Sequence, residues 1–425
     1  MLRIGLTGGI ACGKSEVARR FAAAGFATLD LDRLAHEVMA PGRPAHTDVR
    51  AAFGPGILAP DGSIDRRALG ALVFRDPAAR ERLNALVHPR VREEEVLRAQ
   101  ALASRPDAVL VTDAALLVEA GMHLRFDRLV VVHCPPELQV ARLRERDALS
   151  EEDARARVAA QMPVDAKVRF AHFAVDSSGT LSDTHRAADA LVLSLRELAA
   201  HRPQPARVSR ARAKGALAHG WSPGPRGLRV EDLAAHLVSH GGLELALLAR
   251  TIDPPVSGPW YVPGLAPPPA LVAQRSEPEA AALTVPLVLF ERARHGPDPE
   301  KLAAGAHSLA WLTDPHPERI ASAVLMALVL EEIAASEGIP PDLESRAVVL
   351  GTVAARWGRA EAGTTVMSAV RAAVRHPRDP AAARGALAKA RVESGLAGAM
   401  VGLATGIQEE AANVWEPFLR LLESG

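Results

Sequence analysis

The sequence is poor in cysteine, with two among 425 residues. Two cysteines cannot form a disulfide framework, so they indicate a reducing compartment. Neither sign of charge is in excess, since 50 basic residues balance 50 acidic ones, whereas a general nucleic-acid binder needs a basic surplus. No apolar run reaches the roughly 18 residues of a membrane span, and the N-terminal MLRIGLTGG lacks a signal peptide's apolar core. We therefore expect a cytoplasmic protein that contacts neither membrane nor nucleic acid.

The first 200 residues have the pattern of an α/β domain. Nearly half of all residues (48%) are apolar, and the length predicts two or three domains. Short β-branched runs, typical of a parallel sheet covered on both faces, alternate with helical patterns. The predicted strands are 2–6, 108–112 and 128–133, and the predicted helices include 15–24, 76–87 and 141–146. This order indicates βαβ units.

The remainder of the chain has a different composition. Residues 201–228 are rich in Pro, Gly and Arg and predict a basic linker, and residues 229–425 predict an all-helical domain. A Pro-rich connector is expected at 254–269. The predicted helices are 230–251, 278–295, 315–337, 343–356 and 380–392, with a buried helix at 395–407. Asp314-Pro315 and Asp379-Pro380 predict helix starts, because each places a capping carboxylate before a first-turn proline.

One motif points directly to chemistry. Directly after the first predicted strand, G-x-x-x-x-G-K-[ST] is matched at every specified position by Gly8, Gly9, Ile10, Ala11, Cys12, Gly13, Lys14 and Ser15. The glycines let successive N–H groups point at phosphate oxygens, and the following helix adds its N-terminal dipole. Lys14 can bridge the terminal phosphates, and the Ser15 hydroxyl can ligate Mg²⁺. The motif predicts nucleotide phosphate binding.

Two carboxylates follow the next apolar segment. Asp30 and Asp32 are two residues apart, so on an extended backbone they would share one face. An acid at the carboxyl end of such a strand can accept a proton from a hydroxyl group or hold Mg²⁺ through water. The alternative is that one of them caps the following helix, and for Asp30 both interpretations stay open.

Together these segments resemble the dephospho-CoA kinase family. Residues 7–15 are similar to its TGGIGSGKS loop, and residues 30–36 are similar to its D-A-D-x-x-A-H segment. Further resemblances follow in order: 83–89 to L-x-x-(I/L)-x-H-P, 113–119 to D-x-P-L-L-F-E, 139–147 to Q-x-x-R-L-x-x-R-D, and 160–162 with Lys167 to A-Q-M and K. The resemblance covers about residues 1–197.

The resemblance implies an α/β P-loop kinase fold with a parallel sheet, a helical substrate part and a mobile lid. It implies transfer of the γ-phosphoryl group of ATP, with Mg²⁺, to the ribose 3′-hydroxyl of dephospho-CoA. Asp32 would be the general base and Lys14 and Arg146 would assist transfer, with Arg146 favoured over Arg142 for the transferring phosphate. The implied nucleotide site is residues 8–16, including Glu16, with Arg142. The implied substrate contacts are Thr7, Asp32, His88 and Leu116, and the implied metal ligands are Ser15 and Asp113.

The chain also departs from the family pattern. Ala11 and Cys12 replace Gly and Ser, so Ala11 must adopt the backbone angles of the loop, and a thiol at a helix N-terminus is expected to have a lowered pKa. Glu16 stands where the family often has Thr, and segment 171–179 departs on the adenine side. The rival interpretations are a kinase of another small nucleotide or hydroxyl acceptor, or a nucleotide-binding module without catalysis.

For residues 229–425 the sequence carries no motif that indicates a reaction. Ala- and Leu-rich helical faces predict packing within a module that mediates homo-oligomer or protein-partner contacts, with a second enzyme or a regulatory ligand site as alternatives. His236 and His240 would share a helix face, as zinc ligands can. We interpret them as structural histidines because no H-E-x-x-H pattern surrounds them.

Overall fold

The structure, a computed structural model, describes residues 1–219, 230–240, 281–313, 316–387, 391–406, 418–420 and 422, except positions 103, 106, 204, 205, 207 and 282. The chain divides into two compact units. The first contains residues 1–117, 128–164 and 173–202, and the second contains residues 118–127, 165–172 and 203–425. The second unit thus includes two short segments, 118–127 and 165–172, that come before residue 200 in the chain.

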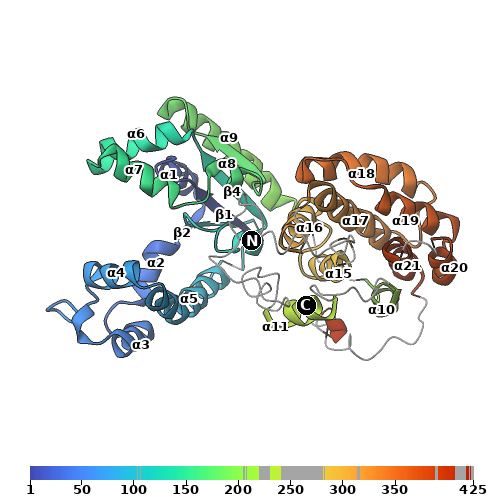
Figure 1. Ribbon diagram of the computed structural model, residues 1–425, viewed down its shortest axis with the longest axis horizontal. Helices are drawn as coiled ribbons and strands as arrows, with labels where there is room; N and C mark the ends of the chain where they lie inside the picture. The colour runs from blue at the N-terminus through green and yellow to red at the C-terminus, as the bar shows by residue number, and fades with distance from the viewer. Residues whose placement is uncertain are drawn as a thin grey trace. The chain divides into compact units, whose positions relative to one another are not determined.

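A five-stranded parallel sheet forms the centre of the first unit (Figure 1). Its strands are β1 (Leu2–Gly8), β2 (Ala27–Asp30), β3 (Val109–Asp113), β4 (Arg128–His133) and β5 (Phe173–Asp176), in the order β2-β3-β1-β4-β5. The three predicted strands are confirmed as β1, β3 and β4, while β5 was not predicted. Since β1 lies between β3 and β4, the loop after β1 is at the point where strand order reverses, the usual ligand position in such sheets.

Helices surround the sheet and extend from its carboxyl-terminal edge. Between β2 and β3 the chain forms four helices, and between β4 and β5 it forms the α6–α7 hairpin (Figure 1). The helices of the first half are α1 (Lys14–Ala23), α2 (Leu31–Val38), α3 (Pro44–Phe53), α4 (Arg66–Arg75), α5 (Pro77–Gln100), α6 (Pro136–Asp147), α7 (Glu151–Ala159), α8 (Val164–Val168) and α9 (Leu181–Ala200), with short 3₁₀ turns at Pro55–Ile57 and His123–Arg125.

Helix α5 is twice as long as the pattern predicted. Asp76 caps it by accepting a hydrogen bond from the backbone N–H of Ala78, which confirms the predicted start. The predicted end at residue 87 was wrong, because the helix continues through Pro89 to Gln100. Strong helix formers after Pro89 offset the hydrogen bond that the proline cannot donate.

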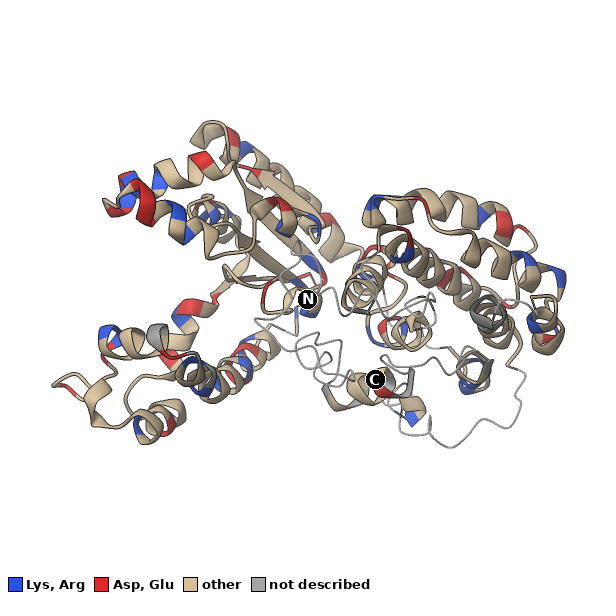
Figure 2. Ribbon diagram, in the orientation of Figure 1, with Lys and Arg blue, Asp and Glu red and all other residues tan. Residues whose placement is uncertain are grey.

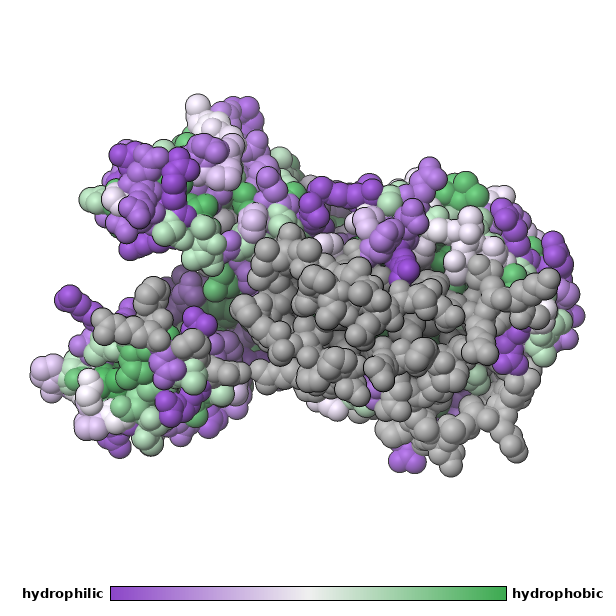
Figure 3. Space-filling view, viewed as in Figure 1, coloured by the Kyte–Doolittle hydropathy of each residue, from purple (hydrophilic) through white to green (hydrophobic). Residues whose placement is uncertain are grey.

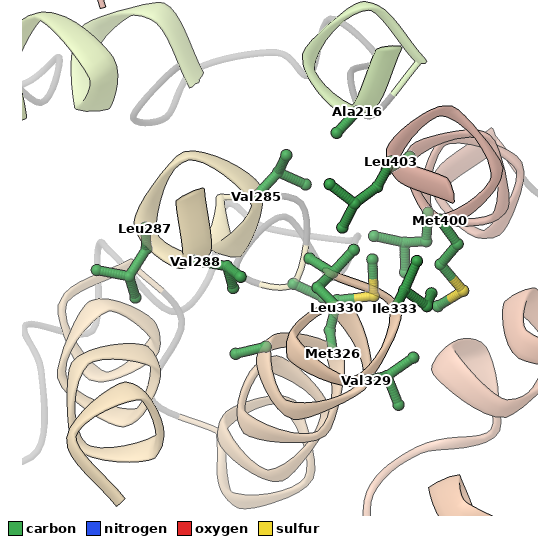
Figure 4. Close-up of a cluster of buried hydrophobic side chains, with 14 of the residues drawn as sticks. Ala216, Val285, Leu287, Val288, Met326, Val329, Leu330, Ile333, Met400 and Leu403 are labelled. Carbon is green, nitrogen blue, oxygen red and sulfur yellow. The ribbon is translucent and has the colours of Figure 1, made fainter. Parts of the chain in front are cut away.

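The second unit is helical. Within the described residues its helices include α10 (Arg210–His219), α11 (Val230–His240), α15 (Thr284–His295), α16 (Pro299–Thr313), α17 (Pro317–Ala335), α18 (Leu343–Gly358), α19 (Thr364–Arg375), α20 (Pro380–Gly385) and α21 (Arg391–Thr405). Helix α17 is buried on nearly all sides and packs against α15 and α21 (Figure 4). An all-round apolar helix of this kind indicates the centre of a core. Helices α10, α16 and α19 were not predicted.

Helix α10 lies in the segment that the sequence predicted as a linker. It crosses α21 so closely that a Cβ atom on Gly215 would lie 2.3 Å from the carbonyl oxygen of Gly402. Arg212 donates from Nε to the carbonyl oxygen of Leu403, at 2.6 Å, and from Nη2 to that of Ile333, at 2.8 Å. The arginine therefore adds a charged donor to carbonyl groups in the last turns of α21 and α17, where intrahelical donors run out; the carbonyl oxygen of Ile333 also accepts a hydrogen bond from the N–H of Ser336. Part of the basic segment is structural for this reason.

Two short segments of the first 200 residues belong to the second unit. In residues 118–127, the carbonyl oxygen of Phe126 accepts a hydrogen bond from Lys301 Nζ at 3.2 Å. In residues 165–172, the Phe170 ring contacts His307 edge-on, with ring centroids 5.0 Å apart. Lys167 and Glu119, one from each segment, form an ion pair of 2.7 Å in which the lysine side chain is fully buried.

Several predictions concern residues outside the described part of the chain. These are the connector at 254–269, the cap at Asp314-Pro315 and most of residues 220–280. The cap at Asp379 is confirmed, because its carboxylate accepts a hydrogen bond from the N–H of Ala382. In the part that the structure describes, no helix is long and apolar enough to cross a membrane.

Candidate active site

The phosphate loop joins β1 to α1 in the conformation that its sequence predicted. Ala11 and Gly13 have positive φ angles of 58° and 78°, so Ala11 does adopt the left-handed backbone of this loop. Gly8 is needed for a different reason: a Cβ atom there would lie 2.4 Å from the carbonyl oxygen of Val132 on β4. Small residues thus let the loop curl tightly over the end of the sheet.

Three side chains from distant segments hold this loop. Gln161 Oε1 accepts a hydrogen bond from the N–H of Ile10 at 2.9 Å, and Ser177 Oγ donates to the carbonyl oxygen of Cys12 at 2.8 Å. Arg142 donates from Nη1 to the carbonyl oxygen of Ala11 at 3.4 Å and from Nη2 to that of Ser177 at 2.7 Å. Sequence reasoning matched Gln161 and Arg142 to family positions but missed Ser177, which stands where the family pattern has Asn.

Lys14 connects the loop to the neighbouring strand. Its ammonium group forms an ion pair with Asp113 at the end of β3. Asp113 is buried, and burial raises the pKa of its carboxyl group; Lys14 opposes this shift, while the nearby charges of Asp30 and Asp32 add to it. The pairing of Asp30 with Asp113 in the β2–β3 register explains this proximity. The carboxylates of Asp30, Asp32 and Asp113 therefore lie near Lys14 at the carboxyl-terminal edge of the sheet.

The structure separates the roles of Asp30 and Asp32. Asp30 ends β2 and caps α2, because its Oδ1 accepts a hydrogen bond from the N–H of Arg33 at 2.9 Å. Asp32 lies two residues later, in the first turn of α2, and its side chain is exposed. The expectation that both acids lie on one extended strand was wrong, since the strand ends between them. Among the described residues, the carboxylate of Asp32 has no hydrogen-bond partner.

The predicted substrate residues lie on separate elements. Thr7 is buried in β1, and its hydroxyl donates to the carbonyl oxygen of Ala115 at 2.9 Å, which ties the loop after β3 to the central strand. In that loop, Leu116 is 50% exposed. His88 lies on α5 with solvent access, yet surrounding protein atoms partly desolvate its ring, which lowers its pKa.

Arg146 and Glu16 are engaged away from the loop. At the end of α6, Arg146 donates to both carboxylate oxygens of Asp147, at 2.7 and 2.9 Å, and its side chain is 59% exposed. The structure thus brings Arg142 to the loop and leaves Arg146 on the surface; the role of Arg146 at the transferring phosphate stays a prediction. Glu16 pairs with Arg19 and lies 3.5 Å from His185 Nε2.

Ion pairs run along the α6–α7 hairpin, where basic and acidic residues are interspersed (Figure 2). They join Arg144 to Glu151, Arg155 to Glu151, and Arg157 to Asp147. Exposed pairs of this type contribute little stability individually. The two helices are packed together chiefly by an apolar cluster of Val140, Leu143 and Ala154.

The space-filling view shows a cleft in the first unit (Figure 3). One wall is the side of α6 and α7, which is mostly hydrophilic, and the other is the side of α3 to α5, which includes hydrophobic surface. The carboxyl ends of β1, β2 and β3 meet at one edge of the sheet, with Asp30 and Asp113 at the ends of β2 and β3. Lys14 and Asp32 follow in the first turns of α1 and α2. A concave site with converging charged groups is the usual form of an active site.

The donor set fits a divalent cation of the magnesium type. Ser15 offers an exposed hydroxyl oxygen at the start of α1, and Asp113 offers a carboxylate whose pKa is raised partly by two neighbouring acids. No group of three or more His, Cys, Asp or Glu side chains within the described residues is arranged to hold a metal directly. Mg²⁺ needs no such cage, because it keeps several waters and is bound by one or two carboxylates together with substrate phosphates.

The chain is similar to known proteins over its N-terminal part. A family model described as dephospho-CoA kinase matches residues 2–183. Dephospho-CoA kinases of Leifsonia xyli subsp. xyli and Geobacter sulfurreducens are 45% and 46% identical over 197 and 183 residues, covering 46% and 43% of this chain and 100% and 93% of theirs. A Thermus thermophilus protein of known crystal structure is 34% identical and aligns with a TM-score of 0.41 over 46% of this chain and 97% of its own. These matches lie in the first half of the chain.

Proposed function

The chain belongs to the dephospho-CoA kinase family, whose reaction is the last step of CoA biosynthesis, and we propose that its reaction takes place at the edge shared by Lys14, Asp32 and Asp113. There the γ-phosphoryl group of ATP passes to the ribose 3′-hydroxyl of dephospho-CoA, giving ADP and coenzyme A. The observation that carries this placement is the ion pair between Lys14 and Asp113, which joins the phosphate loop to the carboxylates at the ends of β2 and β3.

Phosphate binding rests on the loop and Lys14. The N–H groups of residues 8–15, together with the start of α1, face the β- and γ-phosphates of ATP, and the lysine neutralises their charge. In the structure the Ile10 N–H is occupied by Gln161 and the lysine by Asp113. ATP takes over these donors, because a phosphate oxygen is a stronger acceptor than a neutral amide.

Asp32 is the general base. A base needs a carboxylate oxygen that is free to accept the proton of the 3′-hydroxyl. Asp30 is occupied as the cap of α2 and Asp113 as the partner of Lys14, whereas Asp32 is exposed and unoccupied among the described residues.

Mg²⁺ would be held by the Ser15 hydroxyl and, through water, by Asp113, and when bound it would neutralise charge on the phosphates.

Arg142 keeps the phosphate loop in its conformation. Arg146 reaches the phosphates only if its guanidinium leaves Asp147, as closure of the α6–α7 hairpin would allow. His88 and Leu116 are proposed to contact dephospho-CoA, since both have solvent-accessible side chains beside elements that carry the site.

We assign the helical unit to contacts with a second copy of the chain or with a protein partner. Support comes from two adjacent exposed valines on α18, Val348 and Val349, which are 61% and 65% exposed. Apolar side chains of this exposure on a helix are candidates for an interface. Light scattering of the purified chain tests this, since a monomer at micromolar concentration would exclude self-association. A cytoplasmic location stays a prediction from composition.

The decisive experiment compares Asp32→Asn with Asp30→Asn in an assay of ATP and dephospho-CoA. Asp32→Asn keeps the shape but cannot accept a proton, so we expect kcat to fall by about 10²–10⁴-fold with little change in KM for ATP. Asp30→Asn is the matched control, because an asparagine also caps a helix well. A larger loss in Asp30→Asn than in Asp32→Asn would show that the base is assigned to the wrong acid.

A further inference from the structure

The two cysteines of the chain are brought together at the phosphate loop. Cys12 lies inside the loop, and Cys134 follows β4, 122 residues later. Their Sγ atoms are 3.5 Å apart, and both side chains are buried, at 0% and 1% exposure. Because β1 and β4 are neighbouring parallel strands, the loops at their carboxyl ends meet. The contact is therefore a consequence of the sheet and not of a chance encounter at the surface.

The surroundings make the pair reactive. A hydrogen bond with Cys12, the positive charge of Arg142 and a hydrogen bond with Ser177 lower the pKa of Cys134 to about 7, against burial and the charge of Asp176, which act in the opposite direction. Arg142 Nη1 lies 3.7 Å from the sulfur. The sequence led us to expect a lowered pKa for Cys12, and this was wrong: the hydrogen bond with Cys134 and burial raise the pKa of Cys12.

We propose that Cys12 and Cys134 form a reversible disulfide under peroxide and that this bond switches off nucleotide binding by the phosphate loop. The proposal rests on the proposed role of that loop in binding ATP. A thiolate beside a guanidinium, with a second thiol at contact distance, is the arrangement that peroxide-sensitive proteins need: one sulfur to react and one to resolve the product.

The chemistry balances with hydrogen peroxide as the oxidant. The Cys134 thiolate attacks one peroxide oxygen, so that an S–O bond forms, the O–O bond breaks, and the departing hydroxide takes up a proton to become water. The Cys12 sulfur, giving up its proton, then attacks the sulfenic acid: the S–S bond forms, the S–O bond breaks, and the departing hydroxide leaves as a second water. Two thiols and one peroxide thus give one disulfide and two waters, and a dithiol reductant reverses the reaction by exchange.

The new bond would move the loop. A disulfide is about 2.05 Å long, so the two sulfurs must approach by about 1.5 Å. The backbone of Cys12 is held by Ser177 Oγ, at 2.8 Å from its carbonyl oxygen, and Lys14 follows two residues later. Displacement of catalytic geometry by about 1 Å can cost about a hundredfold in rate. Oxidation should therefore weaken ATP binding while leaving the sheet intact.

The test treats the purified full chain with hydrogen peroxide, then measures kcat/KM for ATP and maps cross-linked peptides by mass spectrometry. We expect a peptide joining Cys12 to Cys134, at least a tenfold loss of kcat/KM, and recovery after dithiothreitol. Cys134→Ser should give no such peptide and should keep more than half of its own untreated activity. Cys134→Ala, checked by circular dichroism, replaces it if the serine variant misfolds.

Three results would overturn the proposal: no linkage between the two cysteines at full thiol loss, a linkage without loss of kcat/KM, or an equal loss in the Cys134 variant. The peptide map distinguishes this failure from failure of the proposed function. Untreated enzyme that cannot phosphorylate dephospho-CoA would count against the function, whereas the disulfide is detected whether or not the enzyme turns over.

Discussion

Replacing Arg142 by Ala tests whether this side chain shapes the nucleotide site. The guanidinium joins the loop to the end of β5, through the carbonyl oxygens of Ala11 and Ser177, at 3.4 and 2.7 Å. A hydrogen bond with one charged partner contributes about 1.5–3 kcal/mol. Counting only the shorter bond, and taking about 1.4 kcal/mol per tenfold, we expect the affinity for ATP to fall roughly ten- to a hundredfold.

The measurement is the Kd of a non-hydrolysable ATP analogue by calorimetry, together with KM and kcat. Arg144→Ala is the matched control, because Arg144 is on the same helix but pairs with Glu151 in solvent, 3.6 Å away. Arg142→Lys keeps the charge without the planar fork, so it should resemble the alanine variant more than the wild type. An ATP affinity within twofold of wild type in Arg142→Ala would refute the reasoning, and a loss in kcat alone would mean that the arginine acts only on the transferring phosphate.

Two further substitutions probe stability. An L-residue at φ 58° costs about 1–2 kcal/mol, and the extra flexibility of glycine in the unfolded chain offsets about 0.4–1 kcal/mol of this. Ala11→Gly should therefore stabilise the first unit by up to about 1.6 kcal/mol. Thermal unfolding measures the gain, and Ala24→Gly, at a negative φ of −76°, is the control that should not stabilise. Burial, with the positive charge of Arg169 adding repulsion, lowers the pKa of His307 to about 3. Between about pH 6.5 and 3 the unfolded state therefore binds more protons than the folded state, so the free energy of unfolding decreases as the pH is lowered, by about 2 kcal/mol from pH 7 to 5. His307→Phe should remove this dependence in urea unfolding, and an unchanged pH slope would contradict it.

The parts of the site that the sequence predicted are those encoded within one short segment. Residues 8–15 carry their own turn, and even the unusual backbone of Ala11 follows from its place in the motif. Asp32 was expected on the same extended segment as Asp30, because the pattern does not show where β2 gives way to α2. A cap can be read from the sequence only once that boundary is known.

The contacts that sequence reasoning missed join residues far apart in the chain. Ser177 and Cys134 reach the loop because β4 and β5 lie beside β1, and strand order cannot be read from composition. Helix α10 was missed for another reason. Its arginines suggested solvent exposure, whereas Arg212 is partly buried because helix-end carbonyls accept its hydrogen bonds.

The two segments shared with the helical unit have a consequence for how this protein can be divided. The relatives that match the first half are complete within about the first 200 residues, which suggests a cut there. Such a cut would leave residues 118–127 and 165–172 in the kinase fragment but remove their partners, including His307 and Lys301. The Phe170 ring would lose its contact with His307 and become exposed to water. Asp127 would lose its ion pair with Lys301, whose ammonium nitrogen lies 3.7 Å away. The second unit therefore contains residues from three stretches of the chain, and a single cut near residue 200 would not separate the two units.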